Sequence, residues 1–239
     1  MYDGELYLEL HRGTLTAKQQ IKKNNRMAEN LLRMLELCLT RSAVATHTPA
    51  DGTALRPLWN TLLVNQFHDI LPGSCIAAAN DRSLHDMAEM LHTGSELLRS
   101  WFAPAQNCYT VLNPLDEPCR DVFYLPQIAS GFIAQEPGVT LQNVVLADGT
   151  AATAVYGLER PALGAAVLHF VPGEQPAQTS HFVYDGKTLT TPLLQVQLDE
   201  LGRITSLVTR ADGMQWADGP MNTLLMAEDV SAGWDGWDI

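Results

Sequence analysis

The sequence predicts an α+β multidomain protein in which a three-helix bundle is followed by an antiparallel β-sandwich. Before residue 104, three long segments carry apolar residues at spacings of three and four, which is typical of helices with one buried face. After it, prolines and glycines separate short β-branched runs at intervals of about ten residues. We therefore expect a helical domain over residues 16–104 and a β domain over residues 105–239.

The first helix is expected to begin at Thr16, because Thr16 and Gln19 have the spacing of a capping box. Its predicted buried stripe consists of Ile21, Ala28, Leu31, Leu35 and Leu39. Its opening turns also hold four basic residues, Lys18, Lys22, Lys23 and Arg26. We expect these to form a solvated helix face, with nucleic-acid contact as the alternative.

The second helix is expected to begin at Pro57 and to close at His68, and Ser74 is the expected N-cap of the third. The third helix has a predicted buried stripe of Ile76, Leu84, Met87, Leu91 and Leu98. A second stripe on this helix is polar and consists of Asp81, His85, Glu89, His92 and Glu96. A salt-bridged face in water is the expected role of the polar stripe, and a metal site is the alternative.

In the β half, the alternation in "LLQVQLDELGRITSLV" predicts two strands joined by a tight turn. The ending "AGWDGWDI" stops in mid-pattern, so we expect the sandwich to be truncated there. Trp234 and Trp237, which stand next to Asp235 and Asp238, are expected to be aromatic core residues of the β domain. A platform for a sugar is the alternative.

Composition excludes several classes of protein. An apolar fraction of 46% is that of a folded globular chain. The net charge of −12 disfavours nucleic acid and anionic membrane surfaces as partners. No apolar run approaches the length of about 20 residues that a membrane helix needs, and the N-terminus lacks a secretion signal. The four cysteines form no C-x-x-C pair, so we expect free buried thiols in a reducing cytoplasm.

The segment "NQFHDILPGS" places His68 and Asp69 side by side where an apolar helix ends before a Pro-Gly turn. Burial is expected there, and buried imidazole and carboxylate groups need partners. On the residues alone, a cationic His68 at the negative end of the helix dipole is one interpretation, with Asp69 starting the turn. A metal or ligand site is the other interpretation.

Several segments resemble the α-mannosidases of glycoside hydrolase family 38, in the same order along the chain. They are "GELYLELHRGTLTAKQQIKKNNRMAENLL", "LWNTLLVNQFHDILPGSCI", "VLNPL", "QVQLDELGRITSLV" and "NTLLMAEDVSAGWDGWDI". The resemblance implies that residues 1–15 end the catalytic region, that 16–104 form the helical middle domain, and that 105–239 begin the C-terminal β domain. The bacterial type, with a small substrate such as a mannosylglycerate, is one expectation.

In that family a zinc ion at the bottom of the mannose site is held by a His-x-Asp pair, a second aspartate and the histidine of the present motif. The resemblance implies that His68 is this zinc ligand and that Asp69 accepts hydrogen bonds from sugar hydroxyls. It also implies that His11, in "LELHRGTLT", contacts the substrate, although an ordinary loop residue is an equal alternative.

The chain departs from the family because it contains no His-x-Asp: His68 and His85 precede aspartate directly. The family takes its aspartate nucleophile from an N-terminal catalytic domain, which is expected as the partner of this chain. We expect part of a zinc-dependent retaining exo-α-mannosidase that hydrolyses terminal α-mannosides and is inactive alone. A structural or carbohydrate-binding module without chemistry is the alternative.

Overall fold

The computed structural model describes two compact units of the chain. The larger contains residues 1–175 and 230–239, and the smaller contains residues 176–229. The residues described within them are 9–102, 105–174, 180–228, 230, 233 and 236–237. Among these residues, no helix has both the length and the apolar character that crossing a bilayer requires. Each unit is described by itself below.

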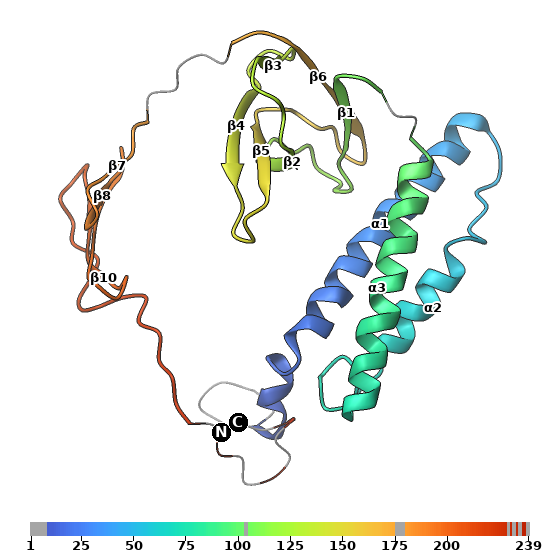
Figure 1. Ribbon diagram of the computed structural model, residues 1–239, viewed down its shortest axis with the longest axis horizontal. Coiled ribbons are helices and arrows are strands. Elements are labelled where there is room, and N and C mark those ends of the chain that lie inside the picture. The colour runs from blue at the N-terminus through green and yellow to red at the C-terminus, as the bar shows by residue number, and fades with distance from the viewer. Residues whose placement is uncertain are drawn as a thin grey trace, which may run out of the picture. The chain divides into compact units, whose positions relative to one another are not determined.

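The larger unit begins with a short 3-10 helix, η1 (Glu9–Leu15), followed by α1 (Gln19–Thr46), α2 (Arg56–Asn65) and α3 (Ala77–Ser100). The three α-helices contact one another and form the predicted bundle (Figure 1). Their common core consists of Ala28, Leu32, Leu35, Leu55, Leu58, Leu62, Met87 and Met90. The spacing of apolar residues therefore predicted the helices and most of their buried faces correctly.

Both predicted N-caps are wrong. The helix α1 begins at Gln19, after Lys18 in a left-handed conformation with φ of 49°, and no side chain caps it. Thr16 instead belongs to the preceding turn, where its N–H donates to the carbonyl of Gly13. The helix α3 follows Ile76, which is exposed rather than buried as predicted. The hydroxyl of Ser74 bonds Asp69 and is not a cap.

Two antiparallel sheets in the larger unit pack around one core and form a sandwich. One contains β1 (Cys108–Leu112), β6 (Ala165–Pro172) and β3 (Phe132–Ala134), in that order. The other contains β2 (Phe123–Pro126), β5 (Ala151–Tyr156) and β4 (Thr140–Val145). The core contains Leu141, Val155, Leu168 and Phe170 from strands of both sheets, together with Leu158, which follows β5. The α+β fold class is therefore confirmed.

The smaller unit is an antiparallel sheet with the order β10-β9-β8-β7. Its strands are β7 (Val183–Tyr184), β8 (Thr188–Thr190), β9 (Leu194–Leu198) and β10 (Ile204–Thr209). The predicted hairpin in this segment is confirmed by the pairing of β9 with β10. The predicted domain boundary at residue 104 stays a prediction.

The four cysteines, Cys38, Cys75, Cys108 and Cys119, are all free thiols. Each is partly rather than fully buried, so only the free state agrees with the prediction. Burial and the charge of nearby Arg41 act in opposite directions on the thiol of Cys38, and burial prevails, so the pKa of Cys38 is raised.

Candidate functional site

The loop of residues 66–76, which joins α2 to α3, carries His68 and Asp69. The prediction that His68 closes the second helix is wrong, because α2 ends at Asn65. Beyond that point the backbone tightens, since the N–H of Phe67 donates to the carbonyl of Val64 three residues back. Further turns follow, in which the N–H groups of Ile70 and Leu71 both donate to the carbonyl of Phe67.

His68 and Asp69 are brought together at the surface of this loop. The Nε2 atom of His68 lies 3.5 Å from Oδ2 of Asp69, and the two side chains are 75% and 46% exposed. The expected burial is therefore wrong for both. The Phe67 ring lies against the imidazole with 4.2 Å between centroids. Because both polar groups face outward, a ligand or another polypeptide can reach them.

Ser74 holds the carboxylate of Asp69 from the other end of the loop. Its hydroxyl lies 3.2 Å from Oδ1 of Asp69 and 3.4 Å from the backbone carbonyl of the same residue. Only Oδ1 receives this bond, so Oδ2 stays directed to the imidazole of His68. The hydroxyl therefore orients the carboxylate beside the histidine.

The loop is fastened to the start of α1 by Lys22. Its ammonium donates to the carbonyls of Ala17 at 2.5 Å, Leu71 at 3.0 Å and Pro72 at 3.0 Å. Burial lowers the pKa of Lys22. The prediction of a solvated basic face holds for Lys18, Lys23 and Arg26, which are exposed. It is wrong for Lys22, which is partly buried.

Glycine 73 allows the loop to approach the turn before α1 closely. Its φ is +88°, and a Cβ at this position would lie 2.8 Å from the carbonyl oxygen of Ala17. At the other end of the loop, the Gln66 amide donates to Asn25 Oδ1 and to Glu29 Oε1, both at 3.1 Å. The helix α1 thus fixes both ends of the segment that presents His68.

His11 lies on η1, exposed, with its ring edge-on to Trp237 at 5.2 Å between centroids. The N–H of Gly13 also donates to the carbonyl of Trp237 at 2.8 Å. A Cβ on Gly236 would lie 3.2 Å from Cα of Ser74. Residues 236–237 therefore contact both η1 and the loop of residues 66–76, and Trp237 packs on a helix instead of in a sheet. Trp234, Asp235 and Asp238 lie outside the described residues.

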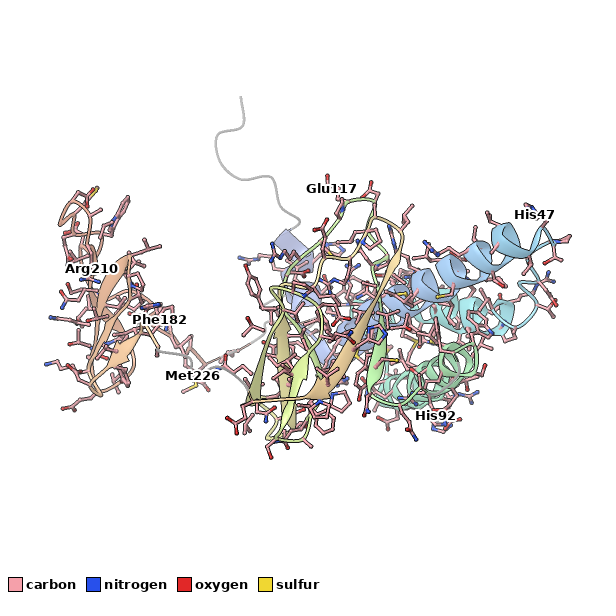
Figure 2. All side chains as sticks on the ribbon, turned by 90° about the horizontal axis from the view of Figure 1, so that it is seen from above. His47, His92, Glu117, Phe182, Arg210 and Met226 are labelled. Carbon is pink, nitrogen blue, oxygen red and sulfur yellow. The ribbon has the colours of Figure 1, made fainter. Side chains whose placement is uncertain are left out.

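A zinc ion would find too few ligands within the part of the chain that the structure describes. No three histidine, cysteine, aspartate or glutamate side chains are grouped there so that they could hold a metal. The polar stripe of α3 is exposed along its length, as a solvated face requires, and Figure 2 shows His92 at the outer surface of the bundle. The imidazole of His68 suits zinc as a single nitrogen ligand with Asp69 beside it.

The bundle and the sheets have known relatives. Residues 9–103 match the family described as the alpha mannosidase middle domain. Human alpha-mannosidase 2C1 is 33% identical over 254 residues, which cover 99% of this chain and 22% of that protein. Residues 9–103 therefore belong to the alpha mannosidase middle domain family, and the chain as a whole is similar to part of an α-mannosidase. The alpha-mannosidase of Saccharomyces cerevisiae is 42% identical over 77 residues, or 31% of this chain and 7% of that protein.

Solved α-mannosidase structures share the fold. The crystal structure of an alpha-mannosidase from Enterococcus faecalis V583 matches with a TM-score of 0.56 and 13% identity, over 85% of this chain and 29% of that one. This likeness concerns the fold alone. The chain spans about a fifth of the length of the human relative. The roles of His68, Asp69 and His11 stay predictions.

Proposed function

We propose that this chain is part of a zinc-dependent retaining exo-α-mannosidase that hydrolyses terminal α-mannosides, such as a small mannosylglycerate. His68 is one zinc ligand, Asp69 accepts hydrogen bonds from sugar hydroxyls, and His11 contacts the substrate. The observation that carries the proposal is the exposed pair of His68 and Asp69, with 3.5 Å between Nε2 and Oδ2, on a loop held by α1.

The two side chains fit this role as part of a site. A neutral imidazole and carboxylates are ordinary zinc ligands, and a catalytic zinc site has about three protein ligands, so the remaining ligands come from outside this chain. The bound ion would take vicinal hydroxyls of a mannose in its open positions. Asp69 accepts hydrogen bonds from these hydroxyls, and the hydroxyl of Ser74 holds the carboxylate in position by donating to Oδ1.

The isolated chain is inactive under this proposal. A retaining glycosidase needs a nucleophilic carboxylate and an acid about 5 to 5.5 Å apart across the glycosidic bond. The family takes the nucleophile from the catalytic domain that precedes the middle domain. This domain is the partner of the chain, and the four free thiols support a reducing, cytoplasmic location.

The test uses a hybrid in which this chain replaces its matched stretch in human alpha-mannosidase 2C1. We expect the hybrid to hydrolyse p-nitrophenyl α-mannoside and the isolated chain not to. His68→Ala and Asp69→Asn should each abolish the hydrolysis, whereas His92→Ala, at an exposed histidine of α3, should not change it. Full activity of the His68→Ala hybrid would refute the assignment. A folded, inactive hybrid that still binds mannose would favour a carbohydrate-binding module without chemistry.

A further inference from the structure

Apart from Arg56, its first residue, α2 exposes no charged side chain. Residues 57–68 include no aspartate, glutamate, lysine or arginine, although many of them are exposed. By contrast, α3 exposes Asp81, Glu89 and Glu96 along its outer face. A helix face that remains in water normally carries charged side chains. The outer face of α2 therefore has the composition of a covered surface.

Three large apolar side chains stand out on this face: Leu63 is 57% exposed, Val64 is 65% exposed and Phe67 is 53% exposed. Leu63 and Val64 lie on the last turn of α2, and Phe67 follows in the turn after the helix, where its N–H donates to the carbonyl of Val64. We name these three residues the α2 face. The α2 face adjoins His68 directly, because the Phe67 ring packs against the imidazole. Leu15 and Ile76 are exposed near the same end of the bundle.

We infer that the α2 face is the docking surface for the α-mannosidase polypeptide that lies outside this chain. The length of the relatives supports this occupant, since the chain covers only 22% of human alpha-mannosidase 2C1. An uncharged apolar face suits a buried protein interface and offers nothing to a phosphate backbone. The inference rests on the proposed function in one respect: docking here brings ligands from the other polypeptide to His68.

The α2 face has a matched control elsewhere in the bundle. Val44 lies near the end of α1 and is 69% exposed, against 65% for Val64. His47, which follows α1, marks this end of the bundle in Figure 2. Both valines are on helices and neither contributes to the buried core. Their burial in a longer α-mannosidase should differ if only the α2 face is an interface.

The experiment compares thiol labelling of Val64→Cys and Val44→Cys, followed peptide by peptide with mass spectrometry, in the isolated chain and in the hybrid. Both thiols should react quickly in the isolated chain. In the hybrid, the thiol at position 64 should react at least about tenfold more slowly because interface cores pack as densely as protein interiors. The thiol at position 44 should react as before. Equal rates at position 64 in the two proteins would overturn the inference.

Two further measurements separate this inference from the proposed function. Protection of position 64 should persist in EDTA and in the His68→Ala hybrid, because docking depends on the apolar face and not on the metal. Val64→Asp should lower the melting temperature of the hybrid and leave that of the isolated chain unchanged, whereas Val44→Asp should change neither. Concentration-dependent protection of position 64 in the isolated chain, with dimers in sedimentation, would assign the face to a second copy and overturn the inference.

Discussion

Gly73→Ala tests whether the loop that carries His68 is held against the turn before α1. Alanine at this position meets two separate obstacles. Its φ would have to be +88°, where an L-residue is strained. Its Cβ would also lie 2.8 Å from the carbonyl oxygen of Ala17 and 2.9 Å from Cβ of Lys18. The carbonyl cannot easily retreat, because it accepts the bond from the Lys22 ammonium at 2.5 Å.

Gly131 separates these two effects. It has the same φ of +88°, but nothing lies within 4 Å of the Cβ that alanine would add. Gly131→Ala should therefore show only the backbone cost, about 1–2 kcal/mol. Gly73→Ala should add an overpacking cost of about 1–3 kcal/mol, for a total of about 2–5 kcal/mol.

The assay is urea unfolding followed by circular dichroism, with the free energies of unfolding of both variants compared with that of the unchanged chain. We expect Gly73→Ala to be less stable than Gly131→Ala by about 1–3 kcal/mol. If the two variants lose the same free energy, the loop does not pack against the carbonyl of Ala17 as described. The account of how the loop presents His68 would then be wrong.

Three other changes probe the bundle, the loop and the small sheet. Lys22→Met should lower the free energy of unfolding by about 2–4 kcal/mol in urea, because it removes a charged donor from three carbonyls. Leu62→Ala should cost about 2–5 kcal/mol by the same assay, because Leu62 is fully buried, whereas Leu63→Ala on the exposed face should cost little. The backbone N–H of Arg203 lowers the pKa of Asp199, so the carboxylate stabilises the hairpin above its unfolded pKa of 3.8. This stabilisation should disappear as the pH falls through the folded pKa of Asp199, which amide NMR spectra of the hairpin would record. Asp199→Asn should remove this pH dependence of the hairpin's stability.

The periodic elements could be predicted from the sequence and their ends could not. The apolar spacing of α1 corresponds to a buried face, and the alternation of β9 corresponds to half-buried and exposed side chains in turn, so the helix and the hairpin of β9 with β10 were predicted correctly. The N-caps depend on backbone angles and on competing partners. Lys18 adopts a left-handed conformation, and the hydroxyl of Ser74 is taken by Asp69. Spacing carries no information about either.

The sequence motif identified the candidate site, but it did not predict the exposure of His68 or the contacts around it. Apolar neighbours such as Phe67 predicted burial for His68, but the surface next to them is open in this chain. Lys22 was interpreted as a solvated charge, yet two of the three carbonyls that it bonds, those of Leu71 and Pro72, lie far along the sequence on the loop after α2. The contact between His11 and Trp237 joins opposite ends of the chain, so no local pattern could reveal it.

The zinc content of the hybrid tests the central claim most directly. After dialysis without chelator, we expect stoichiometric zinc in the unchanged hybrid and in the His92→Ala variant, because His92 lies on the exposed face of α3. The His68→Ala variant, folded as judged by circular dichroism, should contain none. Equal zinc in the His68→Ala variant would contradict the claim that this imidazole is a ligand of the metal.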